Sequence, residues 1–355
     1  MNLSILWFLL IAVLWTGYLV LEGFDFGVGM LLKPFARDET ERRMLLRTIG
    51  PLWDGNEVWL LTAGGATFAA FPEWYATMFS GFYLPLLLIL LALIVRICAL
   101  EWRGKINSAV WRDRADWAHT IGAWLPAVLW GVAFANLVQG MQIEVIGGSH
   151  QLTGGFWSLI TPFTLLGGVT TAALFATHGA VFLALKTDGD LRVRAGLLAQ
   201  RLSILSLLVA AVWAVWAQLA FSAHALSWIP LVIAALALVG VVLATRAGRE
   251  GWAFTLNAVA IAAAVALIFV VMYPNVMPSS LDPAWSLTIT NASSSHATLT
   301  VMSFVALVMV PVVLAYQGWS YWVFRQRLVA TSIGAAEGLH PTRIRAFESA
   351  HTPEH

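Results

Sequence analysis

Four acidic residues lie inside apolar stretches of the chain, and they form two pairs. Glu22 and Asp25 lie in the run LVLEGFDFGVGM, and Asp54 and Glu57 lie in GPLWDGNEVWLL. In each pair the spacing is i, i+3, which places both carboxyl groups on one face of a helix. An acid at membrane depth costs on the order of 2.5–3.5 kcal/mol on insertion scales, and acids retained there often form proton relays. We therefore expect a path for protons along these two helix faces.

A structural role is the alternative for the same acids. Glu22 or Asp54 can pair with Arg96, and Asp54 can cap the start of its helix near the lipid head groups. As proton carriers the acids would need water and neutral polar partners, for which Asn56 and Thr62 are close in the sequence. Because structural ion pairs also perturb acids, both interpretations stay open at this point.

The composition of the chain is that of a membrane protein. Of its 355 residues, 59% are hydrophobic and 11% are charged, whereas soluble domains carry about 45–50% apolar and about 25% charged residues. A soluble globular protein, a disordered chain and a nucleic-acid binder are therefore excluded, and a formal charge of +1 says nothing about partners. The single cysteine, Cys98, excludes an internal disulfide framework, thiolate zinc sites and cysteine-bound iron–sulfur clusters.

Apolar runs long enough to cross a bilayer, which takes about 20 residues, recur along the whole chain. The nine runs lie approximately at 4–31, 52–71, 75–99, 118–140, 159–185, 199–221, 228–245, 252–273 and 298–324. They are continuous rather than alternating, so they predict helices and not an outer-membrane barrel. We expect an all-α polytopic fold, with a single nine-helix transmembrane domain at 1–325 and a polar cytoplasmic tail at 326–355. The first run is too long for a signal peptide and follows no basic residue, so it is expected to remain as a helix.

The basic residues predict the orientation of these helices. All 20 lysines and arginines fall in or beside the connectors that follow runs 1, 3, 5 and 7, or after run 9. The opposite loops carry only the acids Glu73, Glu144 and Asp282. Because short cytoplasmic loops are enriched in Lys and Arg, the N-terminus is expected outside and the C-terminus in the cytoplasm. Both acidic pairs then lie in the cytoplasmic half of the membrane, on two adjacent helices.

Other chemistry finds little support in the sequence. A membrane haem b needs axial ligands such as histidine inside a bundle, and only His119 and His178 fall within the apolar runs. A haem between these two is the alternative to our expectation that the chain holds neither haem nor metal.

Gly23 and Gly27 favour close helix packing, with a broken, cavity-lining first helix as the alternative. The chain has no phosphate-binding loop and no HExxH zinc motif.

Seven segments, in order along the chain, resemble subunit II of the cytochrome bd-type quinol oxidases. They are EGFDFGVGM at 22–30, GPLWDGNEVWLLTAGGATFAAFP at 50–72, SGFYLPLLL at 80–88, EWRGKI at 101–106, GVAFANLVQG at 131–140, YPNVMPSSL at 273–281 and SLTITNASSSHATLT at 286–300. Together they cover nearly the whole chain except its C-terminal tail. A short glycine motif alone would not be specific, but seven ordered segments are.

The resemblance implies an enzyme of the bacterial cytoplasmic membrane that oxidises quinol, reduces dioxygen to water and generates a proton-motive force. It implies a heterodimer of two nine-helix subunits about a pseudo-twofold axis, to which small accessory subunits can add. Subunit I would carry two haems b, haem d and the outer quinol-binding loop, whereas subunit II would carry no haem and no catalytic residue. Some members hold a structural quinone in subunit II, for which Trp53 and Arg96 are the candidates here.

The resemblance also assigns roles to the intramembrane acids. Family members have an acid-lined water channel from the cytoplasm at the subunit interface, and its subunit II acids match Asp25 and Asp54. Glu22 stands where members can have Asp, and Glu57 stands where others have Gln. The implied mechanism passes protons from the cytoplasmic rim through Asp54, Asp25 and Glu22 to subunit I, while electrons never enter this chain.

Two other classes of function remain as alternatives. A proton-coupled secondary transporter with a broken first helix would be a solitary, colourless protein that exchanges a solute. A purely structural scaffold for subunit I would leave all four intramembrane acids individually dispensable.

Overall fold

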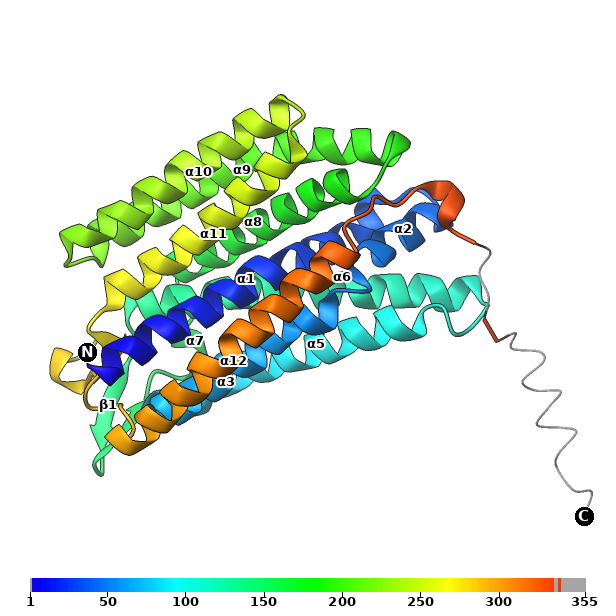
Figure 1. Cartoon of the computed structure of the whole chain (residues 1–355). Helices are drawn as coiled ribbons and strands as arrows, with labels where there is room; N and C mark the ends of the chain where they lie inside the picture. Colours follow the sequence, from blue (N-terminus) through cyan, green and yellow to red (C-terminus); the bar gives the residue numbers. More distant parts are fainter. Residues whose placement is uncertain (1, 335–337, 340–355) are drawn as a thin grey trace, which may run out of the picture.

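Each apolar run of the sequence contains a helix in the computed structural model, which describes residues 2–334, 338 and 339 (Figure 1). The helices are α1 (Leu3–Phe35), α2 (Glu39–Ile49), α3 (Trp53–Ala70), α4 (Pro72–Gly81), α5 (Tyr83–Trp102), α6 (Ala109–Gln139), α7 (Gly155–Ser158), α8 (Pro162–Lys186), α9 (Gly189–Ala220), α10 (Trp228–Arg246), α11 (Glu250–Met272) and α12 (His296–Val323). The long helices lie roughly side by side, so the expected all-α class is confirmed.

Eight helices in this part of the chain are long and apolar enough to cross a membrane. They are α1, α5, α6, α8, α9, α10, α11 and α12. The second expected span is also helical, as α3, but its 18 residues include two acids, an asparagine and three glycines, which lower its hydropathy. The third expected run is divided, because Pro72 opens the short helix α4 before α5 begins at Tyr83.

α3 runs antiparallel to α12 and is hydrogen-bonded to the α12 segment near both of its own ends. Near the end of α3, the carbonyl of Ala70 accepts a hydrogen bond of 2.8 Å from the backbone N–H of Ser294, just before α12 begins. Near the start of α3, Asn56 Oδ1 accepts a hydrogen bond of 3.0 Å from Gln317 Nε2, close to the end of α12. α3 therefore covers most of the depth of a helix that is itself long enough to span a membrane.

Two helices begin well before the apolar runs that they contain. α6 starts at Ala109 rather than near residue 118, and α9 starts at Gly189 rather than near residue 199. Their first turns carry charged residues that pair outside the apolar region, as when Arg192 contacts Glu250 at 2.8 Å. The apolar run therefore marks the part of a helix that faces lipid or core, and not where the helix ends.

α1 packs against α3, α6, α8 and α11 and is an uninterrupted helix of 33 residues. A Cβ atom on Gly27 would lie 2.7 Å from the backbone nitrogen of Gly179, so the backbones of α1 and α8 touch at this point. A Cβ on Gly23 would lie 2.8 Å from the ring of Phe175 on α8. These glycines serve close packing, as small residues do between membrane helices.

Two small β-hairpin pairings lie at one end of the bundle (Figure 1). β1 (Ile143–Ile146) pairs antiparallel with β2 (Ser149–Leu152), and β3 (Asn275–Met277) pairs with β4 (Leu287–Thr288). Gly147 and Gly148 join β1 to β2 with φ of 61° and 84°, as a tight hairpin turn with positive φ at both central positions requires. We call this the hairpin end.

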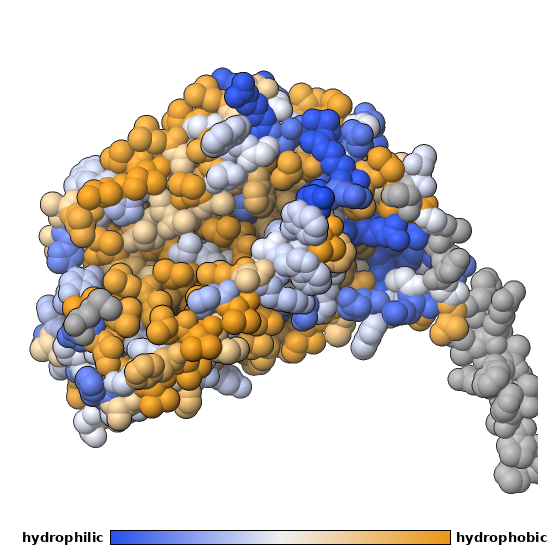
Figure 2. All heavy atoms as spheres, viewed as in Figure 1, coloured by the Kyte–Doolittle hydropathy of each residue, from blue (hydrophilic) through white to orange (hydrophobic). Residues whose placement is uncertain are grey.

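The opposite end, which we call the basic end, consists of α2, the turns at 103–108, 187–188 and 247–249, and residues 324–334. Figure 2 shows hydrophilic residues gathered at this end, whereas the flank of the bundle in view is mostly hydrophobic. Past α12, the chain crosses the basic end: the backbone N–H of Leu328 donates to Lys186 O at 2.8 Å, and Arg43 donates to Gly334 O at 2.5 Å. The expected boundary between 325 and 326 stays a prediction, and residues 335–337 and 340–355 of the expected tail lie outside the described part of the chain.

Candidate functional site

Two of the four acids singled out from the sequence lie in the core of the bundle. Glu22 and Asp25 are both 0% exposed, one helical turn apart on α1, in the half of that helix nearer the basic end. Glu22 Oε2 and Asp25 Oδ1 find no hydrogen-bond partner among the described residues. Buried polar atoms in native structures normally have a hydrogen-bond partner, so these two carboxyl oxygens are unusual.

Asp25 is joined to α12 through a single side chain. Asn56 Nδ2 donates to Asp25 Oδ2 at 2.7 Å, and Asn56 Oδ1 accepts from the hydroxyl of Tyr321 at 2.7 Å and from Gln317 Nε2. Asn56 is fully buried, and its side-chain groups are satisfied from both sides. The result is a polar chain from α1 across α3 to α12, inside otherwise apolar helices. Among the described residues, no lysine, arginine or histidine side chain forms a hydrogen bond with Asp25.

Glu22 lies in a different environment because it has an arginine partner. Arg96 on α5, which is 1% exposed, donates to Glu22 Oε1, and its guanidinium lies over the ring of Phe26 at 4.6 Å. Glu57 is the second acid near this cation, with 3.9 Å between its Oε2 and Arg96 Nη2. The ion pair expected from the sequence as an alternative is therefore present for Glu22, and a buried charge of this kind needs such a partner.

α3 connects this buried cluster to the surface. Glu57 is partly buried, with 21% of its side chain exposed, and Asp54, one turn nearer the start of α3, is exposed. The four acids therefore form a series in depth: Asp54 at the surface, Glu57 below it, and Glu22 and Asp25 in the core. Thr62, expected as a further partner, instead donates to Val58 O on the exposed side of α3.

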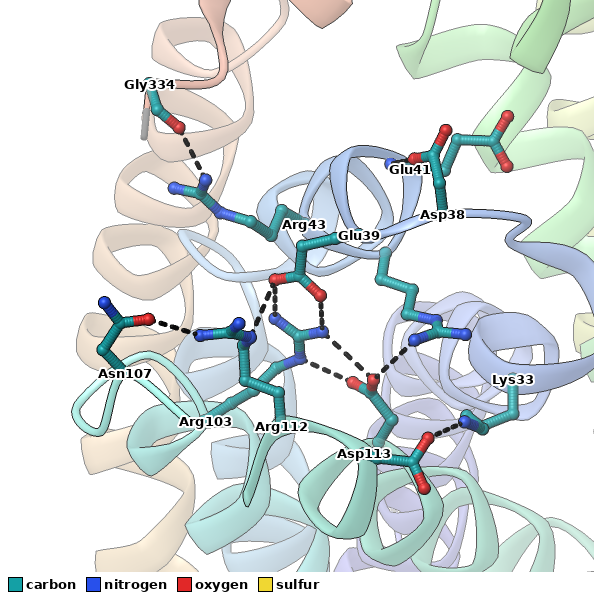
Figure 3. A network of polar contacts seen from close by, with 12 residues as sticks. Lys33, Asp38, Glu39, Glu41, Arg43, Arg103, Asn107, Arg112, Asp113 and Gly334 are labelled. Carbon is teal, nitrogen blue, oxygen red and sulfur yellow. Dashed lines mark hydrogen bonds and ion pairs between the residues drawn. The ribbon is translucent and has the colours of Figure 1, made fainter. Parts of the chain in front are cut away.

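A network of ion pairs holds the basic end together beside this cluster (Figure 3). Arg103, at the end of α5, donates to both oxygens of Glu39 on α2, at 2.9 and 2.8 Å, and to both oxygens of Asp116 on α6. Arg112 adds a contact of 3.5 Å to Glu39, and Arg42 reaches Asp116 at 3.8 Å. Paired in this way, three helices of the basic end are fixed to one another.

These contacts shift the titration of their members in opposite directions. Burial alone would raise the pKa of Glu39, but the hydrogen bonds and charge of Arg103, with the charges of Arg112 and Arg43, lower it below its ordinary value. Burial alone would lower the pKa of Arg103, but hydrogen bonds to Glu39 and Asp116 raise it instead. The charged forms of both groups are therefore favoured in the folded protein.

The two histidines considered for a haem face different surroundings. His119 Nδ1 lies 3.0 Å from the carbonyl of Arg96, and its Nε2 faces the backbone of Gly29. His178 stacks on Phe254, with ring centroids 4.4 Å apart. Nε2 of His119 has no hydrogen-bond partner among the described residues, and the expected absence of a haem from this chain stays a prediction. No three His, Cys, Asp or Glu residues in the described part of the chain are grouped as metal ligands.

The quinone candidates are placed as follows. The guanidinium of Arg96 is bound to Glu22 through Nη2 and lies over the ring of Phe26, and the whole side chain is buried. Trp53 opens α3 and is half-buried. A quinone at Trp53 or Arg96 stays a prediction.

Sequence reasoning missed the two α12 residues of the site. Gln317 and Tyr321 have i, i+4 spacing in the ninth apolar run, and this polar pair in an apolar helix was the signal that could have found them.

Comparison with known proteins decides the family of the chain. The family model described as cytochrome bd terminal oxidase subunit II matches residues 3–324. The chain belongs to this family. Subunit 2 of the cytochrome bd ubiquinol oxidase of Bacillus subtilis is 43% identical over 333 residues, which covers 92% of this chain and 97% of that protein. The corresponding bd-I subunit of Escherichia coli strain K12 is 37% identical over 366 residues, covering 93% of this chain and 96% of that subunit.

A solved structure shares the fold of this chain. A chain of the bd oxidase from Geobacillus thermodenitrificans aligns with a TM-score of 0.74 at 18% identity, covering 91% of this chain and 99% of that one. The resemblance expected from the seven segments is therefore confirmed. This cytochrome bd subunit II is part of a quinol oxidase and is a multi-pass protein of the bacterial cytoplasmic membrane.

Proposed function

We propose that this subunit supplies part of the cytoplasmic proton-uptake path of the oxidase and supports a haem-bearing subunit I. The observation that carries the proposal is the series Asp54, Glu57, Glu22 and Asp25, which runs from the surface into two fully buried carboxyls. Acids held at membrane depth are commonly elements of proton relays. Protons consumed in reducing dioxygen to water would enter at the basic end and move along this series.

In the proposed topology α3 also crosses the membrane, which brings the number of spans to nine. The N-terminus is then outside and the C-terminus is in the cytoplasm. Its support is the hydrogen bonding of α3 to α12 near both ends, which gives the two helices a common depth. The gathering of hydrophilic residues at the basic end supports the same arrangement, because cytoplasmic loops are rich in Lys and Arg (Figure 2).

Subunit I is proposed to pack on the outer surface of α3 and α12. In the most apolar stretch of α12 only 6% of the residues are buried within this chain. Built Cβ atoms on Gly64 and Gly65 of α3, and on Gly318 of α12, would meet nothing within 4 Å. Small residues let membrane helices approach closely, so these open glycines suit a partner helix. We call the exposed surface of α3 and α12 around these glycines the α3–α12 face.

This face is where the proposed path would leave the subunit. The polar chain from Asp25 through Asn56 ends at Gln317 and Tyr321 on α12. Asp25 is a better carrier than Glu22, since Asp25 is bonded to a neutral amide whereas Glu22 is held by Arg96. In this proposal Asp25 is the main carrier of the proton, and Glu22 is a further carrier whose charged form Arg96 stabilises.

The proposal assigns no redox cofactor to this chain. The two haems b and haem d of the family would lie in subunit I, where they oxidise quinol and reduce dioxygen. His119 and His178 contact different parts of the chain, since Nδ1 of His119 lies 3.0 Å from the carbonyl of Arg96 and His178 stacks on Phe254. A structural quinone, small accessory subunits and bound lipid remain further proposed partners.

The alternative of a secondary transporter loses its main structural argument. It requires a broken first helix, whereas α1 is continuous from Leu3 to Phe35 through Gly23 and Gly27. The scaffold alternative differs from our proposal in one respect: it predicts that the acids can be replaced without loss of turnover.

Asp25→Asn and Asp54→Asn in the purified oxidase test the proposal. We expect oxygen consumption to fall while the optical spectra of the haems stay unchanged, because the amide cannot carry a proton. Full oxygen consumption in both variants would contradict the proton path, and loss of the haem d spectrum would indicate an assembly role instead.

A further inference from the structure

A groove opens at the basic end between α8, α9, α10 and α11. It has a volume of about 340 Å³ and is lined by one face of α9, which presents Arg192, Gly196 and Gln200 at i, i+4, i+8 spacing. The start of α11 forms the other side, with Arg249 and Glu250. These helices lie on the flank of the bundle away from α3 and α12 (Figure 1), so the proposed partner subunit would leave the groove open.

Cations outnumber acids around the groove. Glu250 is engaged by Arg192 at 2.8 Å and approached by Arg327 at 3.9 Å, and Asp188 lies 3.9 Å from Arg192. Arg249 is exposed, and its side chain has no hydrogen bond or ion pair with any residue that the structure describes. Arg246, at the end of α10, is exposed as well. The groove therefore has positive charge that this chain does not neutralise.

The wall of the groove is apolar below this charge. Val181, Ala184, Leu197 and Ala253 line it, and Leu197 is 53% exposed towards the surrounding medium. A small soluble anion has no apolar part that could contact this wall. A phospholipid would place its phosphate at the arginines and an acyl chain along the apolar residues, which is the pattern of basic pockets between helices on the cytoplasmic side of membranes.

We infer that this groove binds one anionic phospholipid of the cytoplasmic leaflet, with its phosphate at Arg249 and Arg192 and its acyl chain against α9. The inference goes beyond the proposed proton path and does not depend on it. It commits to a lipid because charge and apolar wall occur together at the level where the bundle passes from lipid to water.

The structure offers a variant that fills the groove without disturbing the fold. A Cβ on Gly196 would meet nothing within 4 Å, and Gly196 lies in the middle of the α9 face that lines the groove. Gly196→Leu therefore occupies the space of the lipid and also favours the helix, since glycine is a poor helix former. Gly251→Leu is the matched control, because Gly251 is equally open but does not line the groove.

The test is native mass spectrometry of the purified two-subunit oxidase with dioleoyl phosphatidylglycerol or dioleoyl phosphatidylcholine. We expect the wild type and Gly251→Leu to retain phosphatidylglycerol in preference to phosphatidylcholine, and Gly196→Leu to lose one bound phosphatidylglycerol. Arg249→Gln should weaken phosphatidylglycerol binding about fivefold, the effect of one arginine near a charged lipid surface. This second variant keeps the test decisive if Gly196→Leu fails to assemble.

Three results would overturn the inference. Equal retention of phosphatidylcholine would remove the role of the charge. Unchanged phosphatidylglycerol binding in both Gly196→Leu and Arg249→Gln would place any lipid elsewhere. Displacement of the bound lipid by millimolar glycerol 3-phosphate would identify a soluble-anion site, whereas resistance to it supports the acyl-chain contact.

Discussion

Asp25 on α1 receives a hydrogen bond of 2.7 Å from Asn56 on α3, and both side chains are wholly buried. The two residues are 31 positions apart in the sequence, on helices that the α2 segment separates. Because Asn56 also accepts hydrogen bonds from α12, it sets the position of the Asp25 carboxyl relative to the α3–α12 face.

Asp25→Asn should lower the rate of oxygen consumption by about tenfold or more, the scale of losing a proton-transferring group. The substitution keeps the size of the side chain and its ability to bond with Asn56, so assembly and haem content should not change. Oxygen uptake by the purified oxidase, with optical spectra recorded on the same sample, checks this expectation. Asp282→Asn, a loop acid at the hairpin end, serves as the control and should leave the rate unchanged.

Asn56→Leu should destabilise the oxidase by about 1–3 kcal/mol, since it leaves buried polar groups without their partner. If Asn56 acts through Asp25, its effect on oxygen uptake should be largely absent when Asp25 is already Asn. A double-mutant cycle on the uptake rate measures this coupling. Independent, additive effects of the two substitutions would separate Asn56 from the path.

Arg96→Met should destabilise the folded subunit by about 3–5 kcal/mol, because Glu22 is then a buried acid without its cation. Adding Glu22→Gln to this variant should restore much of the loss, since the pair of charges has been removed together. The unfolding midpoint of the purified oxidase, followed by scanning fluorescence, reports both values. If the double variant shows no recovery, Arg96 stabilises the subunit by contacts other than its ion pair with Glu22.

The sequence predicts the helical architecture well, because the length of an apolar run can be read directly from consecutive residues. It also singles out Glu22 and Asp25, which are both buried, whereas Asp54 is exposed. It does not predict that Arg96 pairs with Glu22 rather than Asp54, since that choice depends on how α5 packs beside α1. It also does not predict that α2 forms a helix in the first connector, because only its tertiary contacts, such as Arg103 with Glu39, fix this short polar segment.

The residues from α12 illustrate the same limit. Gln317 and Tyr321 are 261 and 265 positions from Asn56, and no local pattern connects them. The extra turns at the start of α6 and α9 were missed for a related reason. Charged residues there do not extend the apolar run, yet their ion pairs let the helix continue into water.

Gly64→Leu should weaken binding of subunit I while the fold of this subunit is kept. A side chain at Gly64 meets nothing within this chain, so a defect in assembly would arise at the α3–α12 face. Co-purification of the haem-bearing partner is the measurement, and Gly251→Leu on another flank is the control. Normal co-purification of Gly64→Leu would place the partner elsewhere.

Glu39→Gln should cost stability at neutral pH but not in acid. The folded protein lowers the pKa of Glu39 below its ordinary value of about 4. Its contribution is therefore present above about pH 4 and is lost as the pH falls through the lower, folded-state pKa. The difference in unfolding midpoint between wild type and Glu39→Gln should shrink as the pH is lowered, and a constant difference would contradict the ion pair with Arg103.

Proton uptake from the cytoplasmic side during a single turnover tests the central claim most directly. The oxidase is placed in vesicles of known orientation, and a pH-sensitive dye reports protons taken up after oxygen is added to the reduced enzyme. We predict that Asp25→Asn slows this uptake by about tenfold or more while electron transfer among the haems starts at the normal rate. Uptake at the wild-type rate in Asp25→Asn and Asp54→Asn alike would show that protons reach the oxygen site without this subunit's acids.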